Sequence, residues 1–250
     1  MQVMLVSMVA PVGEPERSLM LHRELLKLAK REGCALAVFP EMSLTGYVAP
    51  AHGQGMPVAL DCRQVLALLG ATVETGVAAL FGIAEANPGK KPFVTQVFAA
   101  GGRVAGVYRK QHLGEDEGPH FAPGHGGGPW TFEGVTFGVA VCADSQVPDA
   151  FEQAAAAGAS VVFLCSGPGL TGRRTDDASW RAGYDWWRGE CLRLLPSYAR
   201  QFGLTIATAT LAGSTVVEDY PGGNMVIDPG GEVVLEGEDW HPTVVVIEVA

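Results

Sequence analysis

Short β-rich runs alternate with amphipathic stretches along the whole chain, and this alternation most limits how the chain can fold. The first run, Gln2–Val9, predicts a strand. A helix is expected next, because Leu21, Leu25 and Leu28 fall four and three residues apart and so share one face. No linker between the expected elements is long enough to separate domains. We therefore expect a single α/β domain over residues 1–250.

The rest of the chain continues this pattern, with glycine- and proline-rich turns between the elements. Pro196 is expected to kink or restart the helix in which it lies. The expected elements are a strand over Ala35–Phe39, a helix with Leu66, Leu69 and Val73 on one face, a β-meander over Val77–Ala84, Phe93–Ala100 and Arg103–Tyr108, a strand over Val135–Val141, a helix over Pro148–Ala157, a strand over Ser160–Cys165, a helix marked by Trp187, Cys191, Leu194 and Tyr198, and a hairpin turn at Asp228–Gly231.

The charge and cysteine content narrow the functional classes. Seventeen basic residues against 27 acidic ones give a formal net charge of −10, which argues against nucleic acid and against an anionic membrane surface as partners. No apolar run reaches the roughly 20 residues of a membrane span. The five cysteines are odd in number and show no CxxC spacing, so neither a disulfide framework nor a zinc ribbon fits. We expect a reduced, cytoplasmic protein.

Three polar residues stand where apolar runs end. Glu41 follows LAVFP, Lys110 follows VAGVYR and Cys142 follows TFGVAV. Strand ends are where α/β folds tend to place their sites, because a polar group there leaves a rigid and dry scaffold. Taken singly, each residue also has an ordinary structural interpretation: a solvated carboxylate, a surface charge and a buried thiol.

Together, the three residues satisfy a chemical requirement. A thiol is mostly protonated at neutral pH and needs a base to become a nucleophile, and a carboxylate such as Glu41 can accept that proton. The same carboxyl group can return the proton to a leaving amine. The negative oxygen of a tetrahedral intermediate needs a cation or N–H groups, which Lys110 and the backbone N–H of Ala143 can supply.

Three segments carry a resemblance to a known family. FPEMSLTGY (Phe39–Tyr47), YRKQHL (Tyr108–Leu113) and VCAD (Val141–Asp144), in this order and spacing, resemble the signature segments of the nitrilase superfamily, the carbon-nitrogen hydrolases. The resemblance implies a four-layer α-β-β-α sandwich that forms homodimers or larger homo-oligomers. It also implies Glu41 as general base and acid, Lys110 as oxyanion stabiliser and Cys142 as nucleophile. A later segment, Gly222–Val234, is similar to the family too, with Asn224 where members usually have serine.

The resemblance implies further site residues. Members carry a second glutamate after the lysine, six residues before a Pro-Gly pair, and Glu117 stands six before Pro123. Glu115 is the rival for this role. We assign substrate contacts to four residues in or beside the matching segments: Tyr47, His112, Ala143 and Asp144.

Two competing sites can be read in the same sequence. His112, Glu115, Glu117 and His120 lie close enough along the chain to suggest a metal site, although the triad chemistry needs no metal. Gly167–Gly172 spells GxGxxG, but a dinucleotide site requires a helix to open within the motif, and a polar loop is expected there instead. In that loop, Arg173 and Arg174 are candidate contacts for a substrate carboxylate, or simply solvated charges.

The residues after Cys142 indicate the reaction. True nitrilases tend to have Trp or Gly and then Glu there, whereas this chain has Ala143 and Asp144, closer to the amidase-type Cys-Tyr-Asp. We therefore expect a cofactor-independent hydrolase that cleaves a linear carboxamide or N-carbamoyl compound through a thioester. The alternatives are a nitrile hydrolase, a non-catalytic binding protein on the same fold, and a nucleotide-dependent enzyme that uses the Gly-rich loop.

Overall fold

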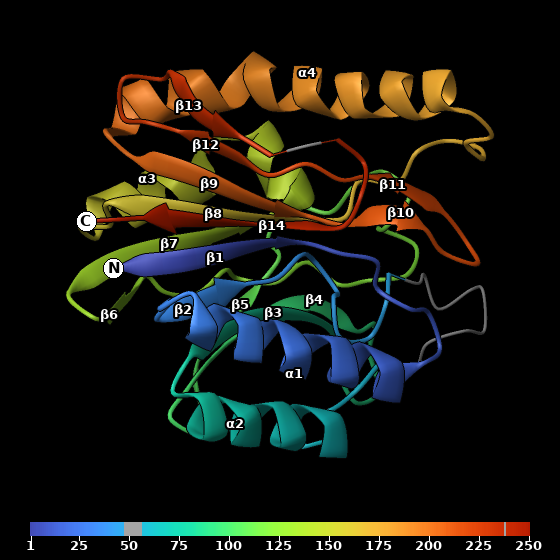
Figure 1. Cartoon of the computed structure of the whole chain (residues 1–250), viewed down its shortest axis with the longest axis vertical. Helices are drawn as coiled ribbons and strands as arrows, with labels where there is room; N and C mark the ends of the chain where they lie inside the picture. Colours follow the sequence, from blue (N-terminus) through green and yellow to red (C-terminus); the bar gives the residue numbers. More distant parts are fainter. Residues whose placement is uncertain (48–56, 238) are drawn as a thin grey trace.

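Two six-stranded sheets lie face to face, and helices cover the outer side of each (Figure 1). The computed structural model describes residues 1–47, 57–237 and 239–250. The four layers run from the helices α1 and α2, through the two sheets, to α3 and α4. This is the α-β-β-α sandwich that the sequence resemblance predicted.

The first sheet has the strand order β14-β1-β2-β3-β4-β5. β1, β2 and β3 are parallel, whereas β3, β4 and β5 form the predicted antiparallel meander. α1 (Pro15–Arg31) and α2 (Arg63–Thr75) cover its outer face. The strands are β1 (Gln2–Ser7), β2 (Leu36–Val38), β3 (Ala78–Glu85), β4 (Phe93–Ala100), β5 (Arg103–Arg109) and β14 (Thr243–Glu248).

The second sheet has the order β13-β12-β9-β8-β7-β6, with β7, β8 and β9 parallel. α3 (Asp149–Ala156) and α4 (Asp177–Phe202) cover it, and a two-stranded hairpin of β10 (Ala212–Ser214) and β11 (Asp219–Pro221) stands beside it. The remaining strands are β6 (Trp130–Phe132), β7 (Val135–Val141), β8 (Val161–Ser166), β9 (Thr205–Thr210), β12 (Met225–Ile227) and β13 (Val233–Glu236).

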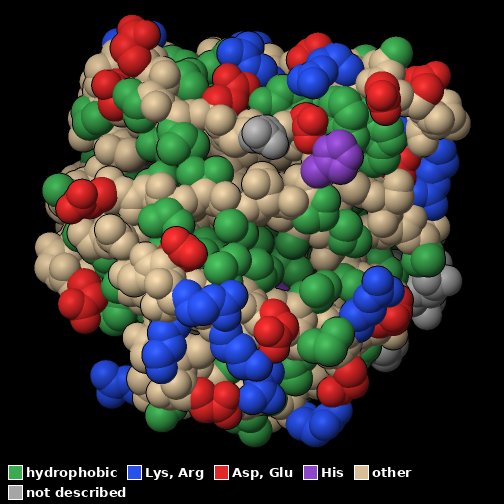
Figure 2. All heavy atoms as spheres, viewed as in Figure 1, with side chains coloured by type: hydrophobic (Ala, Val, Ile, Leu, Met, Phe, Trp, Pro, Cys, Tyr) green, Lys and Arg blue, Asp and Glu red, His purple; other side chains and the backbone are tan. Residues whose placement is uncertain are grey.

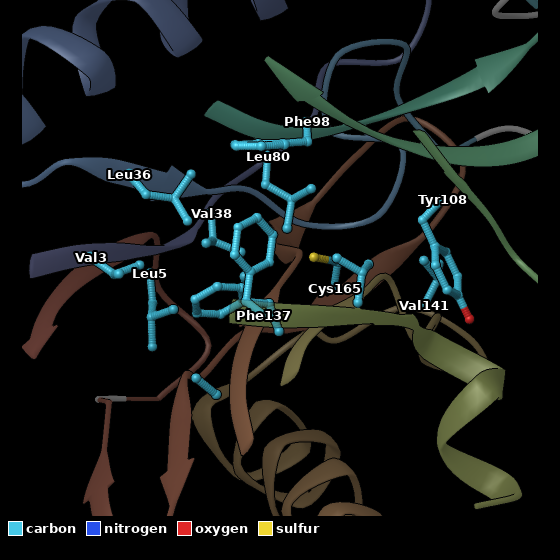
Figure 3. Close-up of a cluster of buried hydrophobic side chains, with 14 of the residues drawn as sticks. Val3, Leu5, Leu36, Val38, Leu80, Phe98, Tyr108, Phe137, Val141 and Cys165 are labelled. Atoms are coloured by element: carbon cyan, nitrogen blue, oxygen red, sulfur yellow. The ribbon is translucent and has the colours of Figure 1, made fainter. Parts of the chain in front are cut away.

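The main core fills the space between the sheets (Figure 3). Leu5 and Leu80 from the first sheet face Phe137 and Cys165 from the second, and all four side chains are fully buried. The rings of Phe98 and Phe137 meet edge to face across this space, with their centroids 5.1 Å apart. Such packing fixes the strand ends of both sheets relative to each other, and with them any site built there.

The apolar stripe predicted for α1 is not its most buried face. Leu21, Leu25 and Leu28 are only partly buried, whereas the fully buried positions include Leu26 and Ala29. The three leucines line a groove of about 910 Å³ that lies between α1 and the start of β14. Figure 2 shows this face of the molecule, with Lys and Arg side chains gathered over its lower half.

Two further helix predictions need correction. In α2, Leu66 and Val73 are 53% and 63% exposed, because the helix packs through the neighbouring face that contains Leu68. α4 is one helix of 26 residues that continues through Pro196 without a break. The apolar face of α4 packs on the second sheet, and this packing offsets the backbone hydrogen bond that proline cannot make. No helix in the described ranges is long and apolar enough to cross a membrane.

Candidate active site

Glu41 lies in a turn that begins where β2 ends, and the turn is fastened to β3. Ser43 Oγ accepts the N–H of Gly82 at 3.1 Å, and the Leu44 N–H donates to the carbonyl of Gly82 at 2.9 Å. A side chain at Gly82 would lie 2.2 Å from the nitrogen of Met42, so this position requires glycine. Met42 itself has a φ of 47°, in the left-handed region. The turn is therefore held in one conformation by β3.

A buried histidine fastens the same turn to α1. His22 Nε2 lies 3.0 Å from Ser43 Oγ, and its Nδ1 lies 2.7 Å from the carbonyl of Ser18. Because a carbonyl can only accept, Nδ1 carries the proton and Nε2 accepts the hydroxyl hydrogen of Ser43. Burial lowers the pKa of His22 to about 4, so the ring stays neutral near pH 7 and keeps this hydrogen bond.

Lys110 follows β5 and joins two glutamates. Its Nζ donates to Glu41 Oε1 at 2.7 Å and lies 2.8 and 2.7 Å from the two carboxylate oxygens of Glu117. Lys110 is 1% exposed, and Glu41 is completely buried. The structure thus brings three of the predicted catalytic residues into direct contact, from segments up to 76 residues apart in the chain.

Cys142 ends β7 and starts the short 3-10 helix η2 (Cys142–Gln146). Its φ of 43° is rare for a residue with a side chain, and strained backbone of this kind clusters at functional sites. Burial raises the pKa of Cys142 well above its ordinary value, and the charge of Glu41 raises it further while that of Lys110 lowers it. The resting thiol is therefore protonated and needs a base.

The charges of the buried cluster are unequally distributed. Burial raises the pKa of Glu41 to about 7, against the opposing effect of Lys110. Burial also raises the pKa of Glu117, but the charge of Lys110 and hydrogen bonds from Lys110, Tyr47 and the Gly114 N–H outweigh it and bring the pKa below its usual value. For Lys110, burial lowers the pKa, and the surrounding negative groups raise it above its ordinary value. Glu117 is thus the permanent anion, whereas Glu41 can exchange a proton near neutral pH.

Gly167 is a site residue that the sequence reasoning missed. Its N–H donates to Glu41 Oε2 at 2.8 Å and also makes a hydrogen bond that lowers the pKa of Cys142. A Cβ at this position would lie 3.0 Å from Tyr47 Cδ2 and 3.0 Å from Leu211 Cδ1. In the sequence, Gly167 stood out only as the first glycine of the GxGxxG pattern, which is typical of dinucleotide sites. The helix α4 begins only at Asp177, so no helix opens within Gly167–Gly172.

Asp144 occupies a different place from the substrate contact that we expected. Its Oδ1 accepts the backbone N–H groups of Gln111 and His112 at 3.1 and 2.8 Å, and its Oδ2 accepts the Tyr108 hydroxyl at 2.8 Å and the Val141 N–H at 3.0 Å. Gln111 and His112 directly follow Lys110, Tyr108 lies two residues before it, and Val141 directly precedes Cys142. Four donors already occupy the carboxylate, so Asp144 ties the lysine segment to the cysteine turn.

We expect Asp144→Ala to damage both activity and stability, because it leaves several donors without an acceptor. Each buried, unpaired donor costs about 1–3 kcal/mol, and a loss of roughly 3 kcal/mol lowers Tm by about 10 °C in a chain of this size. The displaced segments should also reduce kcat/KM at least ~100-fold. Asp149→Ala is the control, since this carboxylate is 50% exposed; equal effects of the two changes would contradict the bridging role of Asp144.

The other predicted substrate contacts fall into two groups. The Tyr47 hydroxyl donates to Glu117 Oε1 at 2.7 Å, so Tyr47 lies at the site but its hydroxyl is already used. Ala143 directly follows Cys142 in η2. The His112 side chain faces away toward α3, where its Nε2 lies 3.3 Å from the carboxylate of Asp149.

Arg173 does not present its guanidinium group to the site. It donates to Asp219 Oδ1 at 2.7 Å and to the carbonyls of Thr215 and Val216 at 2.8 and 2.9 Å. Arg174 likewise turns toward its own loop and bonds the carbonyl of Thr171. The predicted carboxylate fork is therefore wrong for Arg173, because the hairpin of β10 and β11 already occupies it.

The two glutamates near Lys110 are clearly distinguished. Glu117 is 5% exposed and contacts the ammonium group, whereas Glu115 is exposed to solvent. Within the parts of the chain that the structure describes, no three metal-binding side chains converge. The suggested cluster of His112, Glu115, Glu117 and His120 accordingly does not form, since Glu117 faces Lys110 and His112 faces Asp149.

The sequence matches the carbon-nitrogen hydrolase family over residues 6–250. The chain belongs to this family. The match agrees with the resemblance carried by the three short segments.

Two curated proteins are similar to this chain in sequence. An (R)-stereoselective amidase from Pseudomonas sp. is 31% identical over 163 residues, which cover 58% of this chain and 59% of that protein. A formamidase from Pseudomonas syringae pv. tomato is 28% identical over 213 residues, which cover 82% of this chain and 56% of that protein. The matched part is thus less than two thirds of each relative.

A solved structure shows the same fold. The amidase of Nesterenkonia AN1, from the nitrilase superfamily, superimposes with a TM-score of 0.80 at 24% identity. The alignment covers 100% of this chain and 90% of that one. The likeness extends over both sheets and their helices, so the two proteins share this fold.

Proposed function

We propose that this carbon-nitrogen hydrolase is an amidase that cleaves small linear carboxamides or carbamoyl compounds through a thioester on Cys142. The observation that carries the proposal is the buried contact of Lys110 with Glu41 and Glu117 beside this thiol. Burying a cation and two carboxylates carries a desolvation penalty, so such a cluster is weakly explained by stability alone. Perturbed pKa values in such a cluster favour a catalytic role over a structural one.

In the first half of the reaction, Glu41 takes the proton of the Cys142 thiol as sulfur attacks the amide carbon. The C–N bond breaks when the same carboxyl group returns this proton to the departing nitrogen, which leaves as ammonia or an amine. A pKa near 7 suits Glu41 to both directions of transfer at neutral pH.

In the second half, water attacks the thioester. Glu41 removes a proton from this water, the bond between carbon and sulfur breaks, and the proton goes to the departing thiolate. The products are a carboxylic or carbamic acid and the regenerated thiol. Each half uses groups of this chain alone.

Lys110 stabilises the oxygen that becomes negative in both halves. An ammonium group has three N–H donors, and two carboxylates bind it from two sides. The remaining donor and the Ala143 N–H can both point at the substrate oxygen. Because the cluster is buried, this stabilisation is stronger than the same contacts would be in water.

The relatives support amides as the substrate class. Two are named an amidase and a formamidase, and in structures of the Nesterenkonia amidase acrylamide or the acetamide moiety of fluoroacetamide is bound covalently to the active-site cysteine. The test is ammonia release from purified protein over a panel of simple amides, N-carbamoyl compounds and nitriles. Release from the nitriles alone would favour a nitrile hydrolase, and no release with intact folding would favour a non-catalytic binding protein.

Glu117→Gln should lower kcat/KM by ~100-fold or more while the protein still folds, because it removes the permanent anion that orients Lys110. Glu115→Gln is the matched control, since its side chain is exposed, and we expect it to leave activity within about twofold. Steady-state kinetics of both variants on one amide shows which of the two glutamates orients Lys110. A damaging Glu115→Gln beside a harmless Glu117→Gln would reverse the assignment.

Dialysis against a strong chelator should leave the rate of ammonia release unchanged, because every proposed step uses a side chain or a backbone N–H of this chain. The measurement compares treated and untreated protein on the same amide. Loss of activity that added zinc restores would contradict the thiol mechanism as we write it.

We also propose that the protein works in the cytoplasm as a homodimer or larger homo-oligomer. All five cysteines are free, which supports a reducing compartment. The oligomeric state is implied by the family and can be measured by light scattering coupled to size-exclusion chromatography.

A further inference from the structure

The hydroxyl group of Tyr220 is buried and has no hydrogen-bond partner among the residues that the structure describes. Tyr220 lies in β11 and is 1% exposed. A buried hydroxyl without a partner loses its hydrogen bonds to water and gains none in return. Native proteins keep few such groups, and each one calls for an explanation.

Tyr220 packs against the wall of the candidate active site. Its ring lies 6.1 Å from that of Tyr47, centroid to centroid, and contacts Leu211 in a small apolar cluster. Tyr47 and Leu211 are the two side chains closest to Gly167, whose N–H serves both Glu41 and Cys142. The Tyr47 hydroxyl is engaged with Glu117, whereas that of Tyr220 has no such engagement.

The electrostatic surroundings of Tyr220 restrict what it can bind. Burial raises the pKa of Tyr220, and the charges of Glu218, Glu41 and Cys142 raise it further, so the hydroxyl stays neutral. The carboxylates of Glu218 and Glu41 thus act on this hydroxyl, whereas the Cys142 thiol is neutral at rest. Arg173, whose charge also acts on Tyr220, is paired with Asp219. A substrate carboxylate would be repelled at this place, whereas an uncharged donor or acceptor would not.

We propose that Tyr220 is a specificity-determining residue whose hydroxyl binds an uncharged polar substituent, such as a hydroxyl group, on the acyl part of the amide substrate. The inference rests on the proposed function and narrows its substrate class. In this proposal the acyl part of a substrate attached at Cys142 lies against the side of the site that Tyr47, Leu211 and Tyr220 form. There a polar substituent supplies the missing partner, and an apolar one of the same shape leaves the hydroxyl unpaired. Sites of this kind discriminate strongly against the analogue that lacks the polar group.

The experiment uses pairs of amides that differ only by a hydroxyl in place of a methyl group. Glycolamide is compared with propionamide, and lactamide with isobutyramide, by ammonia release from the wild type, Tyr220→Phe and Tyr198→Phe. Tyr198 is a matched control because it is also buried but packs on Phe151 under α4. We expect the wild type and Tyr198→Phe to prefer the hydroxylated amide by at least ~10-fold in kcat/KM.

Tyr220→Phe should bring this ratio close to one and leave kcat/KM for the apolar amide within about twofold. It should also leave Tm unchanged or slightly higher, because an unpaired buried group has been removed. Equal losses on both members of a pair would show a structural role and overturn the inference. A wild type without preference for the hydroxylated amide would overturn it as well, whether or not the variant folds. Absence of turnover on every amide would instead refute the proposed function, and the inference with it.

Discussion

Cys142→Ala is expected to abolish ammonia release, with a loss of at least ~10⁴-fold in kcat/KM, because no other group can form the thioester. The change removes one sulfur atom from a partly exposed position at the end of β7. The fold should therefore remain intact. Cys142→Ser should be almost as inactive, since the hydroxyl has a higher pKa and the site is arranged around sulfur. Ammonia release and a thermal melt of the same samples separate lost chemistry from lost structure.

The covalent intermediate can be observed directly. Rapid quenching of the wild type with a good amide substrate, followed by peptide mass measurement, should place an acyl group on the peptide that contains Cys142. Cys62→Ala serves as the control, because Cys62 is only partly buried and lies before α2. An adduct on Cys165 or Cys191, or full activity of Cys142→Ala, would refute the mechanism.

The three principal site residues were predictable because each directly follows a strand-forming run. Glu41 and Lys110 follow strands of the first sheet, and Lys110 contacts Glu41 and Glu117 there. Cys142 follows β7 of the second sheet, so the packing of the two sheets brings the thiol to this cluster. The β-meander and the four-layer arrangement were likewise predictable. Local runs give the strands, and the resemblance of three short segments gives the way they assemble.

Other features depend on contacts that leave no local mark in the sequence. Asp144 was taken for a substrate contact, and only the tertiary structure shows that its carboxylate holds the backbone N–H groups of Gln111, after β5, and of Val141, at the end of β7. Gly167 supplies a backbone N–H, a role for which no side chain gives a sign. Tyr220 stands 78 residues after Cys142 in an unremarked hairpin. These roles are set by tertiary neighbours, not by residue type.

Which face of a helix is buried depends on tertiary contacts as well. The stripe of Leu21, Leu25 and Leu28 is a real apolar stripe, but it faces a groove at the surface. The buried stripe of α1 contains His22, whose ring packs 4.4 Å from that of Phe39, centroid to centroid, and holds the Glu41 turn. Because His22 is polar, the sequence pattern does not mark its side of α1 as the buried one. Its place in the core is explained by the Glu41 turn, which it holds.

Glu41→Gln is the second change from which we expect a very large effect. The amide side chain has nearly the shape of the carboxyl group but cannot accept the proton of the Cys142 thiol. We expect kcat/KM to fall by roughly 10³-fold, the contribution typical of a positioned general base. Glu41→Asp, which keeps a carboxylate but withdraws it from Lys110 and the Gly167 N–H, should retain more activity than the Gln variant.

The pH profile identifies Glu41 as the base more specifically than the rate alone. Burial raises the folded-state pKa of Glu41 to about 7, whereas the thiol has a pKa well above its ordinary value. The active form has Glu41 ionised and Cys142 protonated, so kcat/KM of the wild type should rise as the pH increases through about 7 and then level off. In Glu41→Gln this acid limb should disappear, because the group that titrates is gone, and in Glu41→Asp a limb should persist at a shifted pH. An unchanged limb near pH 7 in Glu41→Gln would show that another group takes the proton.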